Sequence, residues 1–103
     1  AKRPEMGRIA EGLADAVVLT DDNPRHENGL GIVREIQAGM ARPDRTRVMR
    51  DRAAAIRLAV RDAGCDDVVL VAGKGHEREQ VVGDTVRPFS DFDAVQAALE
   101  DAA

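Results

Sequence analysis

The chain has 103 residues, of which 44% are hydrophobic and 33% charged, and it carries a net charge of −4. This composition is that of one globular domain and excludes a disordered chain. No apolar run is long enough to span a membrane, and residues 1–20 lack the apolar core of a signal peptide. The acidic balance, with Phe89 and Phe92 as the only aromatic residues, counts against nucleic-acid binding as the main activity.

The first half of the chain alternates helical and strand patterns. Pro4 suits the first turn of a helix, and apolar residues then recur with helical spacing from Met6 to Ala14. The continuously apolar run that follows is typical of a strand buried in a parallel sheet. The predicted elements are a helix over 2–14, a strand over 15–20, a helix over 29–40 and a short strand over 47–49.

The second half continues this alternation and adds a hairpin. Asp51 can cap a helix, and Val68–Val71 form the centre of the strongest predicted strand. Gly83 and Asp84 are residue types that favour a two-residue hairpin turn. The predicted elements are a helix over 51–63, a strand over 67–72, a hairpin over 80–86 and a last helix capped by Ser90 or Asp91.

This order of elements predicts an α/β fold. We expect a Rossmann-like, mostly parallel sheet with helices on both faces and a C-terminal hairpin, in one domain over residues 1–103. Because no strand precedes the first helix, we expect the sheet to be truncated at its first strand and the chain to be a fragment cut just upstream of Ala1. The single cysteine, Cys65, cannot form an internal disulfide, and we expect the protein in the reducing cytoplasm.

A cluster of arginines occupies the middle of the chain. Aspartates are interleaved with them, so we interpret the cluster as a solvated helix face and not as a nucleic-acid-binding surface. Its members are Arg42, Arg45, Arg47, Arg50, Arg52, Arg57 and Arg61.

The polar stretch that follows the first predicted strand, Thr20–Glu27, is the most distinctive part of the sequence. Pro24 has a fixed φ and keeps Asn23 out of the helical region, so Arg25 follows a stiff point of the chain. An arginine held in this way at the end of a strand is placed for recognition. The alternative is that Asp22 and Asn23 act only as turn and cap residues.

A second polar loop, Gly73–Glu77, follows the strand predicted at 67–72. Ligands of open α/β sheets bind at the C-terminal ends of the strands, so we expect both polar loops, Asp22–Glu27 and Gly73–Glu77, on the same edge. Arg25 offers a fork of donors for a carboxylate, and Glu77 offers an anion for an ammonium group. Gly73 and Gly75 leave the backbone open to a ligand. Together the loops predict a receptor for a zwitterionic amino-acid head group.

Two other interpretations of the second loop remain open. Gly73-Lys74-Gly75 after a strand resembles the start of a phosphate-binding loop, although the complete motif is absent and His76 and Glu77 stand where its hydroxyl and helix would be. His76 could act as a base or a metal ligand. We expect no zinc site, because His26 is the only other histidine and no cysteine cluster exists.

These residues resemble the C-terminal domain of the Mur ligases, in the branch that adds meso-diaminopimelate as the third residue of the peptidoglycan stem peptide. The resemblance covers essentially the whole chain and rests on three motifs in a fixed order. They are Lys2-Arg3-Pro4 with Met6-Gly7 and Ile9-Ala10, then Thr20-Asp21-Asp22-Asn23-Pro24-Arg25, then Val68 through Glu77 followed by Gln80.

The resemblance implies a substrate and a set of contacts. In this family the Asp-Asn-Pro-Arg motif recognises meso-diaminopimelate, and lysine-adding relatives replace its arginine, which here is Arg25. The glycine and the glutamate of the second motif also contact that substrate. The implied substrate-binding residues are Asp22, Asn23, Pro24, Arg25, Gly73 and Glu77, with Lys74, Gly75 and His76 in supporting positions and no catalytic residue or metal ligand in this chain.

The resemblance also implies what a complete ligase contains in addition. Its other domains bind the UDP-MurNAc-dipeptide, ATP and Mg²⁺, and a Gly-Gly-Asp-Arg-Asp segment with its preceding strand lies just before the residue that corresponds to Ala1. The complete enzyme activates the D-glutamate γ-carboxyl with ATP, and the amine of diaminopimelate then attacks. We therefore expect the isolated chain to be inactive. The alternatives are a nucleotide-binding module that uses Gly73-Lys74-Gly75 and a structural half-domain with no binding of its own.

Overall fold

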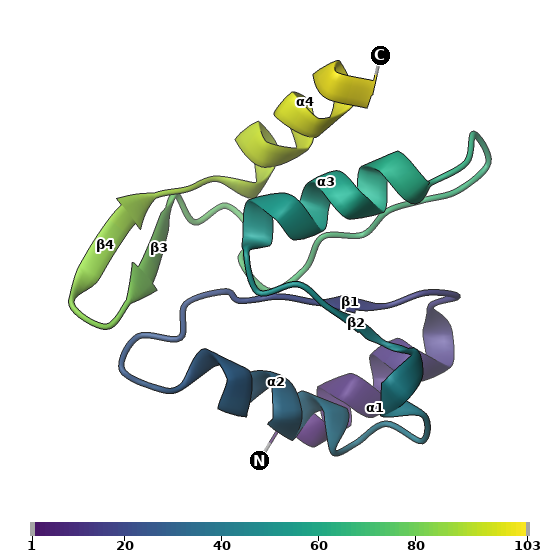
Figure 1. Ribbon diagram of the computed structural model, residues 1–103, viewed down its shortest axis with the longest axis vertical. Helices are drawn as coiled ribbons and strands as arrows, with labels where there is room; N and C mark the ends of the chain where they lie inside the picture. The colour runs from purple at the N-terminus through teal and green to yellow at the C-terminus, as the bar shows by residue number, and fades with distance from the viewer. Residues whose placement is uncertain (1, 103) are drawn as a thin grey trace.

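A computed structural model describes residues 2–102 and shows helices on both sides of a small parallel sheet (Figure 1). The helices and strands are α1 (Arg3–Leu13), β1 (Val18–Leu19), α2 (Gly29–Gln37), η1 (Pro43–Arg45), β2 (Arg47–Val48), α3 (Arg52–Asp62), β3 (Glu79–Val82), β4 (Thr85–Pro88) and α4 (Asp91–Ala102). β1 and β2 pair in parallel. α1 packs on α2 and α3 packs on α4, and the two pairs lie on opposite sides of β1 and β2. The predicted α/β fold is confirmed.

Two helices begin directly after cap residues that the sequence predicts. Asp51 caps α3, because its side chain accepts a hydrogen bond of 3.2 Å from the backbone nitrogen of Ala54. Of the two candidates for the cap of α4, the side chain of Ser90 accepts from the backbone nitrogen of Asp93 at 3.4 Å. The side chain of Asp91 is therefore free for another role, which is described below.

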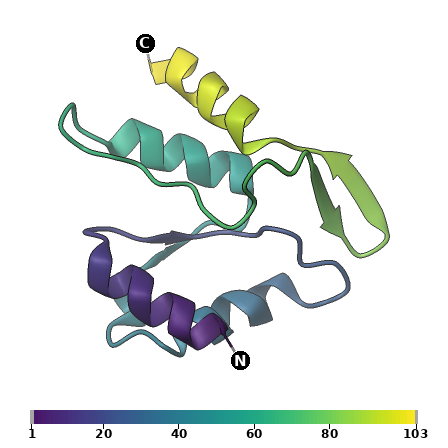
Figure 2. The same cartoon turned by 180° about the vertical axis from the view of Figure 1, so that it is seen from behind.

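The strand predicted over 67–72 is wrong. Residues 67–72 form no strand, and Val68 and Leu70 are 92% and 85% exposed. It runs along α3, between that helix and β1, as both views show (Figure 2). A strand exists only when a neighbour accepts and donates its backbone hydrogen bonds, and no neighbouring strand pairs with this segment within residues 2–102. Its β-branched composition is therefore not sufficient to make it a strand.

The hairpin and the short strands agree with the prediction in position. β3 and β4 are antiparallel, with Val82 opposite Thr85 and Gly83 and Asp84 in the turn. Gly83 has a φ of 58°, which explains why glycine suits this turn. β1 and β2 are only two residues long, so the strand predicted over 15–20 was too long. No helix within residues 2–102 is long and apolar enough to cross a membrane.

Glycines bring α1 and α2 together. The apolar residues whose spacing predicted α1 are largely exposed, whereas Gly7 is its only buried residue. A Cβ atom at Gly7 would overlap the carbonyl oxygen of Ile36, and a Cβ atom at Gly39 would overlap that of Pro4. α1 therefore approaches α2, and the residues just after the end of α2, so closely that backbone touches backbone at both positions.

We expect Gly39→Ala to lower the free energy of unfolding by about 1–3 kcal/mol, because the backbone of α1 must move to admit the added methyl group. Gly12→Ala is the matched control, since nothing lies within 4 Å of a Cβ atom there. That change in α1 is expected to raise stability by about 0.5–1 kcal/mol. Urea unfolding of both variants measures the difference, and equal stabilities would contradict the close contact.

Candidate functional site

The first polar loop, residues 22–27, is attached to the edge of the hairpin. The backbone nitrogen of Arg25 donates to the carbonyl oxygen of Val81 at 3.0 Å, and the backbone nitrogen of Gly83 donates to the carbonyl oxygen of Arg25. Arg25 has a φ of 54°, the only positive φ of a residue other than glycine within residues 2–102. This conformation costs about 1–2 kcal/mol for an L-residue. The hydrogen bonds to β3 and to the hairpin turn hold Arg25 in this conformation, and the preceding residue, Pro24, is buried.

The second polar loop, residues 73–77, turns on two glycines. Gly73 and Gly75 have φ values of 101° and 60°, so a side chain at either position would be strained. A Cβ atom at Gly73 would lie 3.9 Å from a carboxylate oxygen of Asp22. Gly73 thus faces the first loop, and Gly75, His76 and Glu77 are exposed.

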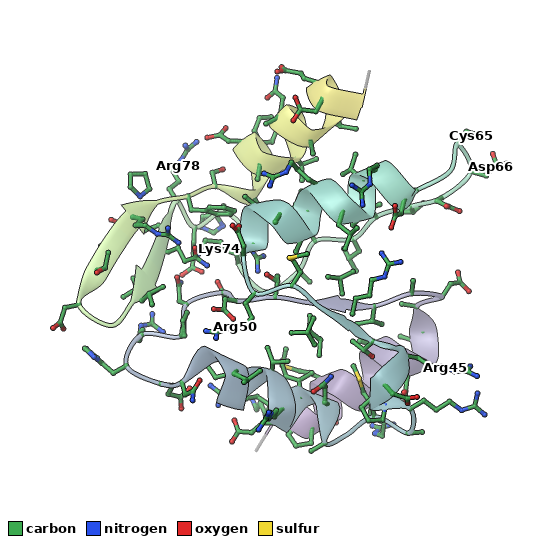
Figure 3. All side chains as sticks on the ribbon, viewed as in Figure 1. Arg45, Arg50, Cys65, Asp66, Lys74 and Arg78 are labelled. Carbon is green, nitrogen blue, oxygen red and sulfur yellow. The ribbon has the colours of Figure 1, made fainter. Side chains whose placement is uncertain are left out.

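The two loops contact one another directly through Lys74. Its side chain is completely buried, and Nζ lies 3.3 Å from Oδ1 of Asp22 and 3.1 Å from Oδ1 of Asn23. Figure 3 shows Lys74 at the end of α3 that faces the hairpin, with Cys65 and Asp66 beyond the opposite end. The sequence prediction that both loops lie on one edge of the domain is therefore correct.

Asn23 provides the second connection. Its Oδ1 also accepts from the backbone nitrogen of Val81 at 2.9 Å, and its Nδ2 donates to Oε1 of Glu77 at 3.5 Å. The second loop and β3 thus both bind to one amide group of the first loop. Asn23 is partly buried and bound within the protein, whereas Arg25 and Glu77 are exposed at the surface. The roles of these residues in binding stay predictions.

Sequence analysis missed the buried polar groups beneath the loops. We interpreted Arg52 as part of a solvated helix face, and this is wrong, because only 3% of its surface is exposed. Its guanidinium binds both carboxylate oxygens of Asp91, at 2.7 and 2.8 Å. The helical spacing from Arg52 to the buried residues Ala55 and Ile56 was the signal that could have placed it inward.

The guanidinium of Arg52 stays protonated although it is buried. Burial lowers the pKa of its guanidinium, but the hydrogen bonds and the negative charge of Asp91 outweigh that effect, and the pKa is raised overall. Asp22 and Glu77 also contribute attraction. An arginine is cationic at every physiological pH in any case. A fixed positive charge therefore lies beneath two loops that carry acidic side chains.

Two other polar side chains bind the first loop and the residue that precedes it. Nε2 of Gln80 donates to the carbonyl oxygen of Asp22 at 2.9 Å, and the side chain of Arg50 forms an ion pair with Asp21 at 3.1 Å. Each of these partners lies more than 25 residues away in the sequence and was not identified by the sequence analysis.

The second loop does not have the structure of a phosphate-binding loop. Such a loop ends at the N-terminus of a helix and directs a lysine toward the ligand. Here the loop leads into β3, and the amine of Lys74 is buried against Asp22 and Asn23. The geometry therefore counts against the nucleotide interpretation of this loop.

Comparisons with known proteins agree with this architecture. Residues 1–75 match the glutamate ligase domain of the Mur ligases. The chain is 53% identical over 98 residues to the UDP-N-acetylmuramoyl-L-alanyl-D-glutamate--2,6-diaminopimelate ligase of Xylella fastidiosa (strain 9a5c), an overlap of 95% of this chain and 20% of that protein. It is 58% identical, with the same coverage, to the protein of that name from Alkalilimnicola ehrlichii (strain ATCC BAA-1101 / DSM 17681 / MLHE-1).

A solved structure of a UDP-N-acetylmuramoyl-L-alanyl-D-glutamate--2,6-diaminopimelate ligase superposes with a TM-score of 0.90 at 35% sequence identity. The overlap covers 97% of this chain and 21% of that chain. The chain therefore spans about a fifth of the length of the relatives that it matches. The matched residues 1–75 make up most of the chain and include the first loop and the second loop as far as Gly75. The chain therefore belongs to the Mur ligase family and matches the glutamate ligase domain of that family.

Proposed function

We propose that residues 1–103 form the amino-acid-binding domain of a ligase that adds meso-diaminopimelate to the D-glutamate of a UDP-linked muramoyl dipeptide. The pairing of the two loops carries this proposal, because it places an arginine loop and a glutamate loop side by side at one edge of the domain. Relatives at 53% and 58% identity are named as ligases for 2,6-diaminopimelate, which supports the choice of substrate.

The site chemistry matches the charges of this substrate. meso-Diaminopimelate has an ammonium and a carboxylate group at each end. The planar fork of Arg25 suits the distal carboxylate, and the carboxylate of Glu77 suits an ammonium group. L-Lysine lacks the distal carboxylate, so Arg25 is the residue that distinguishes the two amino acids. The glycine backbone at Gly73 lets the substrate approach the second loop closely.

The part of this domain in the reaction is positioning. It holds the attacking amine so that its nitrogen bonds to the γ-carbonyl carbon of the acyl phosphate made with ATP. The carbon–oxygen bond to phosphate breaks, phosphate leaves, and the nitrogen releases a proton to solvent. Orientation of two reactants can supply a large share of the barrier reduction. No side chain of the two loops is required as an acid or a base in this proposal.

ATP and Mg²⁺ are proposed to bind mainly outside this chain. Within residues 2–102 no group of three His, Cys, Asp or Glu side chains could hold a metal ion, and the second loop lacks phosphate-loop geometry. These observations support placing the nucleotide and the metal in other parts of the complete ligase, and the family resemblance places the UDP-linked substrate there as well. Since the reaction consumes ATP, we place the enzyme in the cytoplasm.

The test is a ligation assay with the full-length ligase that carries these residues. We expect turnover with meso-diaminopimelate and much weaker turnover with L-lysine, and no ligation by residues 1–103 alone. Calorimetry of the chain with ATP and with meso-diaminopimelate gives a second readout. Equal use of lysine, ligation by the isolated chain, or binding of ATP alone would each contradict the proposal.

A further inference from the structure

A single buried side chain connects the bases of both loops. Arg52, the first residue of α3, donates from Nη1 to the carbonyl oxygen of Asp21 at 3.2 Å and from Nη2 to the carbonyl oxygen of Ala72 at 3.1 Å. Asp21 directly precedes the first loop, and Ala72 directly precedes the second. The planar guanidinium therefore reaches the backbone at the point where each loop begins.

The orientation of this guanidinium is fixed from the other side. Nε and Nη2 of Arg52 bind Oδ1 and Oδ2 of Asp91, the first residue of α4. A two-point contact between arginine and a carboxylate defines the plane of the guanidinium as well as its distance. The donors that remain are thereby directed toward the carbonyl oxygens of Asp21 and Ala72. Four hydrogen bonds from one side chain join α3 and α4 to the two loops.

We propose that Arg52 is a positioning residue that sets the separation of the two loops, and through it the separation of Arg25 from Glu77. This inference rests on the proposed function, in which those two side chains hold different groups of one diaminopimelate molecule. A ligand with two charged ends needs both contacts at a fixed spacing. Arg52 is buried and acts through the backbone of the loops, so it does not touch the substrate.

Lysine cannot replace Arg52 in this position. Its ammonium is a compact point charge with three donors on a flexible chain, whereas the observed contacts require a planar group with donors on several sides. Arg52→Lys keeps the positive charge and removes the geometry. Arg57, in the same helix and exposed, offers a matched control in Arg57→Lys.

The experiment measures steady-state kinetics and hydrogen exchange in the full-length ligase. For Arg52→Lys we expect KM for meso-diaminopimelate to rise roughly tenfold to a hundredfold, while KM for ATP changes by less than about twofold. We also expect faster amide exchange in residues 22–27 and 73–77 and unchanged exchange in α1 and α2. Arg57→Lys should alter none of these quantities.

Asp91→Asn serves as a second variant, because it leaves Arg52 in place and weakens only its anchor. It should shift the same KM in the same direction by a smaller factor. Two results for Arg52→Lys would overturn the proposal. One is a KM for meso-diaminopimelate within about twofold of that of the unsubstituted enzyme. The other is an equal rise in KM for meso-diaminopimelate and for ATP, together with faster exchange throughout the domain. If the unsubstituted enzyme does not use meso-diaminopimelate, the proposed function fails, and the exchange data still decide whether Arg52 positions the loops.

Discussion

Replacing Asp91 with alanine is expected to lower the free energy of unfolding by about 3–5 kcal/mol. The change leaves the guanidinium of Arg52 buried without its counter-charge, and only 3% of the Arg52 side chain is exposed to water that could compensate. The loss of a partner from a buried ion pair is costly for this reason, even where the intact pair adds little net stability. Urea unfolding followed by circular dichroism measures the effect.

Asp93→Ala is the matched control for that prediction. Asp93 lies in the same first turn of α4 but is exposed, so its removal costs only the interaction with the helix dipole, about 0.3–1 kcal/mol. If the two alanine variants unfold at the same urea concentration, the ion pair between Arg52 and Asp91 does not stabilise the fold as described.

Replacing Arg25 with alanine is expected to lower kcat/KM for meso-diaminopimelate by roughly tenfold to a hundredfold in the full-length ligase. One hydrogen-bonded contact to a charged group contributes about 1.5–3 kcal/mol, and each factor of ten corresponds to about 1.4 kcal/mol. The change should not reduce the activity with L-lysine, which has no distal carboxylate to lose. The ratio of the two specificity constants is the measurement, because it cancels any general effect on folding.

Two further variants test whether the loss of specificity comes from the carboxylate contact of Arg25. Arg25→Lys keeps the charge without the fork and should fall between the alanine variant and the unsubstituted enzyme. His26→Ala removes an exposed neighbour whose ring lies 3.4 Å from Asp84, and it should leave the ratio unchanged. A ratio that stays constant in Arg25→Ala would refute the carboxylate contact, and the specificity would then lie elsewhere in the enzyme.

Local patterns in the sequence predicted the local structure well. Helical spacing and the cap at Asp51 placed α3 within a residue of its observed ends, and glycine and aspartate placed the turn of the hairpin. These features depend on neighbours within a few residues, which is the range over which a sequence pattern acts. The strand predicted over 67–72 failed because a strand needs a partner that its own composition does not provide.

The candidate site also combines local features that the sequence predicts with long-range contacts that it does not predict. The sequence by itself determined which residues form the two polar loops, because polar residues, proline and glycine mark them, and it also predicted their common edge. Only the tertiary structure showed that Lys74 and Asn23 join the loops, and that Arg52 lies beneath them rather than in solvent. These contacts link residues 20 to 58 positions apart. Long-range contacts of this kind depend on how whole elements pack, and no single segment of the sequence specifies that.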